Sequence, residues 1–144
     1  MKVVYLESSA LLTWLFGETK SSKILSQINE TKIIVSSVIT ILESERAIVR
    51  SENEKIISSS DSHKLKRQIE IFKNEWLFME VTAEVRQRAS CAFPIEPVRT
   101  LDAIHLATAL LFLKAYPTLK VLSLDKRISS NLEPLGIGEI ELTM

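Results

Sequence analysis

One helix in the last third of the chain limits most strongly what this sequence can fold into. From Leu101 to Tyr116, apolar residues occupy almost every side of the expected helix. Such a helix has to be packed on most of its surface, so it belongs inside the structure. Thr100 is expected to be its N-cap, and Asp102 lies in its first turn, where the helix dipole favours a negative charge. The helix therefore brings one carboxylate to its buried end, although an acid there can also serve only as a cap.

Short apolar segments alternate with helical segments along the whole chain. Strands are expected at residues 2–6, 32–35, 76–81, 120–124 and 139–142. Helices are expected at residues 10–16, 20–28, 38–50, 63–75, 83–92, 101–116 and 126–132, and a polar helix end with a loop at 51–62. Ser8 or Ser9 is expected to cap the first helix. The strands show no polar alternation, which indicates that helices cover both faces of the sheet. The sequence therefore predicts an α/β fold, with a parallel sheet of about five strands sandwiched by helices.

The composition is typical of one globular domain, which we expect to span residues 1–144. The chain is 46% hydrophobic and 25% charged, and its formal net charge is zero. Zero net charge argues against coating nucleic acid by bulk charge but is compatible with a local basic patch. The single cysteine, Cys91, excludes an intrachain disulfide framework and a cysteine zinc site, which fits a reducing compartment. Because no secretory signal or membrane-length apolar run is visible, we expect a cytoplasmic protein without membrane contact.

Four acids occupy related places in this pattern of strands and helices. Glu7 ends the first expected strand and Asp125 ends the fourth. Glu43 lies in the helix after the second strand, and Asp102 opens the helix before the fourth. Ligands of open α/β sheets bind beyond the carboxyl ends of the strands, where the strand order reverses. If the first and fourth strands are neighbours there, Glu7 and Asp125 flank the crevice, and the other two acids can reach it from their helices.

A pocket of carboxylates is best explained by a cation, because without one the like charges repel each other. All-oxygen sites suit hard divalent ions such as Mg²⁺ or Mn²⁺, which can activate water for phosphoryl displacement. The four acids are therefore the candidate catalytic and metal-binding residues. Nearby polar groups can support them: Ser9 and Ser123 can orient carboxylates, and Arg46 and Arg99 can contact phosphate. His105, one turn beyond Asp102, is expected to be a core residue rather than a base.

Each acid also has a simpler interpretation. Glu7 can face solvent at a strand end, Glu43 can pair with Arg46, and Asp125 can cap the following helix. A phosphate-accepting signalling receiver also carries acids at strand ends, but it needs a pair of acids after the first strand. Here Ser8 follows Glu7, which argues against that class.

Four segments, in order and covering almost the whole chain, resemble the motifs of a PIN domain. They are Val4–Leu11, which resembles the opening strand and turn, and 36–47, 99–109 and 121–136, which resemble the second, third and fourth acidic motifs. The third, Arg99-Thr100-Leu101-Asp102-Ala103-Ile104-His105-Leu106-Ala107-Thr108-Ala109, is the most specific. The size of the chain and these motifs together resemble the toxin of a VapBC toxin–antitoxin pair.

The resemblance implies an endoribonuclease that depends on Mg²⁺ or Mn²⁺. Its acidic quartet would be Glu7, Glu43, Asp102 and Asp125, and its partners would be the RNA substrate, a second copy in a homodimer and a small VapB-type antitoxin. The chain departs from the family at Glu7, because the family nearly always has Asp there. The carboxylate then sits one methylene further out, and catalytic groups need placement to about half an ångström. The alternative is therefore a weakened PIN-fold module that binds antitoxin or RNA without cleaving it.

Overall fold

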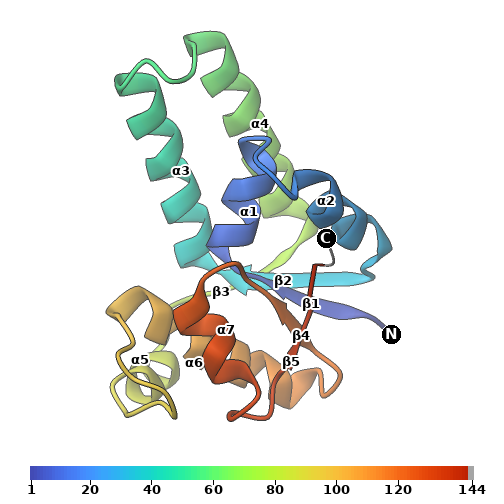
Figure 1. Ribbon diagram of the computed structural model, residues 1–144, viewed down its shortest axis with the longest axis vertical. Helices are drawn as coiled ribbons and strands as arrows, with labels where there is room; N and C mark the ends of the chain where they lie inside the picture. The colour runs from blue at the N-terminus through green and yellow to red at the C-terminus, as the bar shows by residue number, and fades with distance from the viewer. Residues whose placement is uncertain (143–144) are drawn as a thin grey trace.

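The computed structural model describes residues 1–142 and contains one five-stranded parallel sheet (Figure 1). The strands are β1 (Val3–Leu6), β2 (Ile33–Ser37), β3 (Leu77–Met79), β4 (Lys120–Leu122) and β5 (Gly138–Glu139). Their order across the sheet is β3-β2-β1-β4-β5, and every neighbouring pair is parallel. The predicted α/β fold with a parallel sheet of about five strands is confirmed.

The N-terminal strand β1 lies at the centre of the sheet. Tyr5 is in register with Val35 of β2 on one side and with Val121 of β4 on the other. From β1 the chain builds outwards through β2 to β3, and then returns to the opposite side of β1 for β4 and β5. The strand order therefore reverses between β1 and β4, which is the arrangement that would bring Glu7 and Asp125 together. Open α/β sheets bind their ligands at this kind of position.

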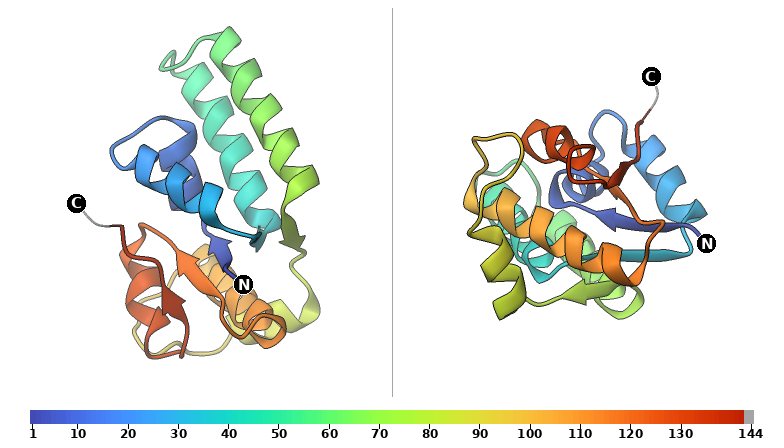
Figure 2. Two further views of the ribbon diagram at one scale, coloured as in Figure 1. Left: turned by 90° about the vertical axis from the view of Figure 1, so that its right-hand side faces the viewer. Right: turned by 90° about the horizontal axis from the view of Figure 1, so that it is seen from below.

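Two layers of helices enclose the sheet. The helices are α1 (Ser8–Leu15), α2 (Ser21–Glu30), α3 (Val38–Asn53), α4 (Ser59–Glu75), α5 (Ala83–Ala89), α6 (Thr100–Ala115) and α7 (Lys126–Leu132). Helices α1 to α4 lie on one side, where α3 and α4 form a long hairpin, and α5 to α7 lie on the other (Figures 1 and 2). Because both faces are covered, the strands need no polar alternation.

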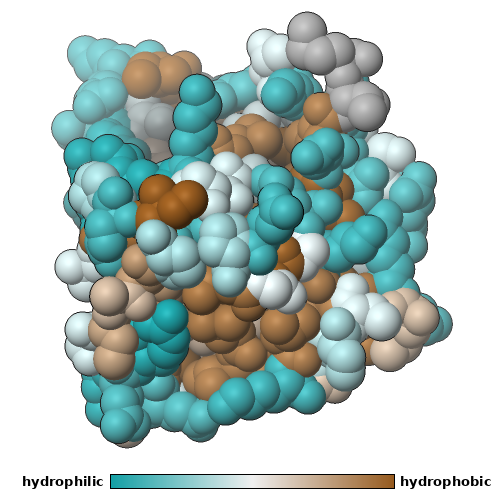
Figure 3. All heavy atoms as spheres, turned by 60° about the horizontal axis from the view of Figure 1, so that its bottom comes forward, coloured by the Kyte–Doolittle hydropathy of each residue, from teal (hydrophilic) through white to brown (hydrophobic). Residues whose placement is uncertain are grey.

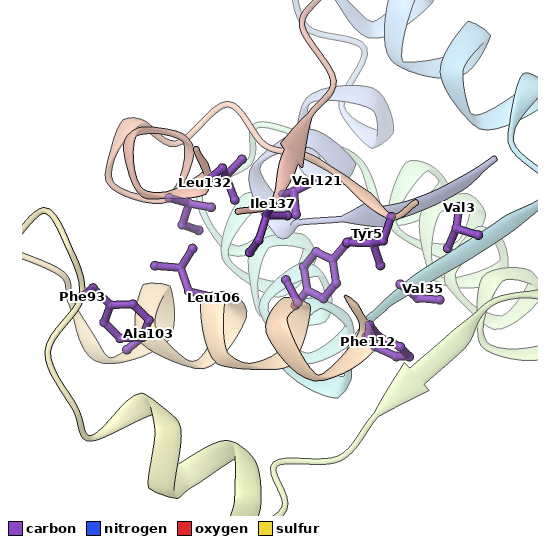
Figure 4. Close-up of a cluster of buried hydrophobic side chains, with 13 residues drawn as sticks. Val3, Tyr5, Val35, Phe93, Ala103, Leu106, Phe112, Val121, Leu132 and Ile137 are labelled. Carbon is purple, nitrogen blue, oxygen red and sulfur yellow. The ribbon is translucent and has the colours of Figure 1, made fainter. Parts of the chain in front are cut away.

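The central strand divides its side chains between two hydrophobic cores. Val4 and Leu6 pack under α1, α2 and α4, in a core that includes the stacked rings of Phe72 and Trp76, 4.1 Å apart. Tyr5 points to the opposite side, towards α6 (Figure 4). Helix α6 buries residues around most of its surface, as its apolar sequence predicted. The helix that carries Asp102 is thus fixed against the sheet over its length.

The helix caps differ from those expected. Glu7, and not Ser8 or Ser9, is the N-cap of α1, and its side chain accepts from the Ser9 N–H. Arg99, and not Thr100, is the N-cap residue of α6, so that Thr100 is already helical. One consequence is that Asp102 occupies the third helical position, where its carboxylate accepts from the Arg99 N–H at 3.2 Å.

Several element boundaries also differ from the prediction. Helix α4 begins at Ser59 rather than at residue 63, because Ser58 and Asp61 form a capping box. In a serine-rich stretch the capping serine cannot be told from its neighbours by residue type. Helix α3 runs to Asn53, α2 runs from Ser21 to Glu30, and α5 ends at Ala89. The strands expected at 76–81, 120–124 and 139–142 are shorter in the structure. Their outer residues leave the sheet where the chain turns towards the next element.

The side of the molecule formed by α5 to α7 also carries an apolar surface (Figure 3). A groove of about 550 Å³ lies there, lined by Leu110, Leu111 and Leu113 together with residues of α5. None of its lining residues belongs to the predicted acidic site. Within residues 1–142, no helix has the length and apolar character needed to cross a membrane.

Candidate functional site

The predicted acids meet at the carboxyl end of the sheet, next to β1 and β4. Glu7 directly follows β1, and its backbone N–H donates to the carbonyl of Leu122, the last residue of β4, at 3.1 Å. Asp125 begins the next helix, α7, as its N-cap. Asp102 enters from the buried end of α6, and Glu43 enters from α3. Four segments that are distant in the sequence therefore supply one acidic cluster.

The Glu7 carboxylate is buried and surrounded by hydrogen-bond donors. Only 3% of the residue is exposed, so the interpretation of a solvent-facing strand-end acid is wrong. One oxygen, Oε2, accepts from the Ser8 hydroxyl at 2.7 Å and from the Ser9 N–H at 3.0 Å. The other, Oε1, accepts from the hydroxyls of Ser9 and Ser123, the latter at 2.6 Å. Burial of this charge is offset by these donors, of which the Ser8 hydroxyl also lies 2.9 Å from Glu43 Oε1.

Glu43 is held by a buried histidine rather than by Arg46. The Nε2 atom of His105 lies 2.8 Å from Glu43 Oε1, and its Nδ1 atom lies 2.7 Å from the Tyr5 hydroxyl. An ionised carboxylate can only accept, so we assign the donated proton to Nε2, and Tyr5 then donates to Nδ1. Burial, followed by the charge of Glu7, raises the pKa of Tyr5 well above its ordinary value, which keeps the phenol protonated as that donor. Two residues of the buried core thus aim Glu43 into the cluster.

The two aspartates are less completely engaged than Glu7. Asp102 Oδ2 accepts from the Arg99 N–H, and Asp125 Oδ1 accepts from the Arg127 N–H at 2.8 Å. No hydrogen bond from residues 1–142 reaches the second oxygen of either side chain. Burial raises the pKa of Asp102, and the charges of Asp125 and Glu7 raise it further, against the lowering effect of the Arg99 N–H and of Arg127. The aspartates are therefore close enough to repel each other, and each has a free oxygen.

The free oxygens fit a hydrated divalent cation. Within residues 1–142, His, Cys, Asp and Glu form no group of three that could hold a metal ion as they stand. Mg²⁺, however, usually keeps several waters and uses only one or two carboxylates. Asp102 and Asp125 supply such a pair of hard oxygen ligands, and a cation between them would relieve the repulsion that raises the pKa of Asp102.

The supporting residues divide into two groups. Ser9 and Ser123 contact a carboxylate of the cluster as expected. Arg46 and Arg99 are exposed, and neither forms an ion pair with the four acids within the described residues. Asp125 does cap the following helix, so its simpler interpretation is correct without excluding a further role.

The sequence did not predict that His105 and Arg127 belong to the site. His105 was expected only to fill the core, although its position three residues after Asp102 placed it on the same face of the helix. Arg127 lowers the pKa of Asp102, and with Lys126 and Asp125 it lines an open pocket of about 530 Å³. Its position two residues after Asp125 was the available signal.

The sequence matches the family model of the PIN domain over residues 4–131. The fold, the acidic cluster and this match together define the class: the chain belongs to the PIN-domain family, a family of nucleases. No curated protein sequence matches it significantly.

Similar solved structures agree over nearly the whole chain. A toxin–antitoxin complex from Klebsiella pneumoniae has a chain with 14% identity and a TM-score of 0.66, over 97% of this chain and 98% of that one. VapBC2 from Rickettsia felis, bound to a promoter DNA fragment, gives 9% identity and a TM-score of 0.63, over 96% and 99%. FitAcB from Neisseria gonorrhoeae has 12% identity and a TM-score of 0.62, over 96% of each chain. At these identities the likeness establishes the shared fold.

Proposed function

We propose that this protein is a metal-dependent endoribonuclease and the toxin of a VapBC-like toxin–antitoxin system. The observation that carries the proposal is the meeting of four acids at the switch point of a PIN-domain sheet. The similar structures from Klebsiella pneumoniae, a toxin–antitoxin complex, and from Rickettsia felis, a VapBC2 complex, support the biological setting. A single domain acting in the cytoplasm, where its RNA substrate lies, is part of the same proposal.

Asp102 and Asp125 are the residues that would hold Mg²⁺ or Mn²⁺. When bound, the cation supplies a water of lowered pKa and offsets the negative charge of the scissile phosphate. Glu43, oriented by His105, stands at the same cluster and can accept a proton from the attacking water. Lys126 and Arg127 line the pocket beside Asp125, so they are placed to attract the phosphate of the RNA strand.

RNA cleavage by the purified chain tests this function. We expect cutting that increases with Mn²⁺ or Mg²⁺ and stops with EDTA, and we expect Asp125→Asn to lose it. Glu80→Gln, which changes an exposed acid on the strand β3 side of the sheet, is the matched control and should cut normally. Cleavage that persists in EDTA, or in the Asp125→Asn variant, would contradict the proposed chemistry.

The second candidate function is a module that binds antitoxin or RNA without cutting. It is favoured by the burial of Glu7 among four protein donors. This candidate predicts Mn²⁺ binding without RNA cleavage, even at high protein concentration. The same titration therefore separates the two functions.

The proposed partners can be tested without RNA. We expect the chain to form a homodimer in solution and to form a complex with the product of a short reading frame beside its gene. Light scattering on the separated protein checks the first, and co-purification checks the second. A monomer at all concentrations would remove the homodimer from the proposal, and a neighbouring product that never co-purifies would remove that candidate antitoxin.

A further inference from the structure

Glu7 is the acid whose surroundings leave least room for a cation. An ionised carboxylate has about four lone-pair positions for donors or metal ions. In this structure the hydroxyls of Ser8, Ser9 and Ser123 and the Ser9 N–H all reach Glu7. The Ser8 hydroxyl also lies 2.9 Å from Glu43 Oε1, so its single proton is shared between the two glutamates. Three donors therefore bind Glu7 alone, and at most one lone-pair position of its carboxylate is open.

The same serines connect Glu7 to the loop that carries Asp125. The Ser9 hydroxyl accepts from the Leu124 N–H at 2.8 Å, and the Ser123 hydroxyl accepts from the Asp125 N–H at 3.0 Å. A hydroxyl has a single proton, so a serine that donates this proton to the carboxylate can only accept hydrogen bonds from its other neighbours. The negative charge of Glu7 fixes both hydroxyls in that orientation. The backbone at residues 124 and 125 is thus positioned through Glu7.

The length of the glutamate side chain suits this role. Glu7 follows β1 directly, while Ser123 follows β4, the neighbouring strand. The side chain reaches across this gap to Ser123 and still caps α1 through the Ser9 N–H. A side chain one methylene shorter would have to give up part of this set of donors.

We propose, on the basis of the function given above, that Glu7 is a positioning residue that holds the Asp125 loop and that does not ligate the cation. Asp102 and Asp125 hold the cation through the oxygens that no described donor reaches. Glu at position 7 then has a structural role of its own in this chain, and it is not a displaced metal ligand standing in for the usual aspartate.

Mn²⁺ affinity and thermal stability of the Glu7→Asp variant of the full chain test the proposal. We expect an Mn²⁺ dissociation constant that is unchanged or larger, measured by calorimetry without RNA. We also expect a Tm lower by about 5 °C, because part of a buried hydrogen-bond network is lost. Mn²⁺ binding that becomes about threefold tighter or more would overturn the proposal, since it would mean that position 7 is a ligand position.

Ser123→Ala gives an independent test if Glu7→Asp does not fold. This change frees one lone pair of Glu7 and removes the acceptor of the Asp125 N–H. The positioning role predicts Mn²⁺ binding weakened about threefold or more, with recovery in Ser123→Thr, which keeps the hydroxyl. Unchanged or tighter binding in Ser123→Ala would overturn the proposal. Ser60→Ala, an exposed serine on α4, is the control for the substitution itself.

Asp102→Asn separates this inference from the proposed function. If the aspartates hold the cation, this variant should weaken Mn²⁺ binding by about tenfold or more. A normal Mn²⁺ affinity in Asp102→Asn would refute the metal site, and with it the function. A weakened affinity in Asp102→Asn together with tighter binding in Glu7→Asp would refute only the role assigned to Glu7.

Discussion

The two glutamates and the two aspartates of the acidic cluster are held in different ways. Glu7 and Glu43 are bound by side chains from the buried parts of the protein. Serines bind both oxygens of Glu7, whereas His105 and Ser8 bind only Oε1 of Glu43. Asp102 and Asp125 each receive a backbone N–H at a helix N-terminus and keep a free oxygen. Glu7 is therefore suited to fixing geometry, Glu43 is oriented but keeps one oxygen for chemistry, and the aspartates are suited to binding something that is not part of the chain.

The difference also separates stability from reactivity. A carboxylate whose donors are all supplied by the fold contributes to the fold, and its loss leaves buried donors unpaired. A carboxylate with a raised pKa and a free oxygen is held at some cost to stability, which is common at functional sites. Substitutions at Glu7 and at the aspartates should therefore differ in kind.

The largest effect is expected from Asp102→Asn. RNA cleavage should fall by about a thousandfold, because one of the two open ligands is lost while the shape and the Arg99 contact are preserved. Initial rates of cleavage at saturating Mn²⁺ measure it. Cleavage within about threefold of the unmodified chain would show that Asp102 does not differ from Glu7 in the way described.

A smaller effect is expected when the support of Glu43 is altered at His105. In His105→Gln the amide nitrogen can replace Nε2 and donate to Glu43, whereas the shorter His105→Asn cannot reach it. We expect cleavage to fall by about tenfold in the Gln variant and by about a hundredfold in the Asn variant. The two variants remove similar packing, so each is the control for the other, and equal losses would show that the ring matters only by filling space.

Tyr5→Phe should affect stability more than cleavage. Loss of the hydroxyl leaves Nδ1 of His105 buried without its partner, which should lower the free energy of unfolding by about 1–3 kcal/mol. Urea unfolding followed by circular dichroism measures the change. Tyr116→Phe is the control, because the half-buried Tyr116 hydroxyl makes no hydrogen bond with residues 1–142. Equal changes in the two variants would argue against a role for the bond to His105.

The smallest effect is a pH-dependent stabilisation in Asp102→Asn. The pKa of Asp102 is raised in the folded state above its ordinary value of 3.8. The folded protein therefore loses stability as pH rises from 3.8 through the raised pKa, because the unfolded chain gives up this proton first. Asp102→Asn removes this penalty, and without metal its Tm should exceed that of the unmodified chain at pH 7. The gain should vanish below about pH 3.8, where Asp102 is protonated in both states. A gain that is the same at pH 3 and pH 7 would point to a cause other than charge.

The sequence contained enough information to predict the sheet and the meeting of the acids. Strand ends and the all-apolar helix α6 depend on local patterns, and the switch point follows from the topology that those patterns favour. The way in which each acid is held could not be predicted. Whether Glu7 faces solvent or Ser123 depends on two strands that become neighbours only in the fold, and the same holds for Glu43 and His105.

The helix caps show the same limit on a smaller scale. Thr100 and Ser8 are good N-cap residues by type, yet the caps are Arg99 and Glu7, because the preceding strand and loop fix where each helix can begin. The basic residue that affects Asp102, Arg127, lies on another helix altogether. A single sequence indicates which residue types suit a helix cap or an acidic site, whereas the fold determines which residues lie next to each other.

The central position of β1 has a consequence for how this protein is made. Strand β1 is synthesised before β4, but the contact between Glu7 and Ser123 joins residues that are 116 positions apart. Asp125 follows two residues after Ser123. A growing polypeptide therefore has no complete acidic cluster until Asp125 has left the ribosome.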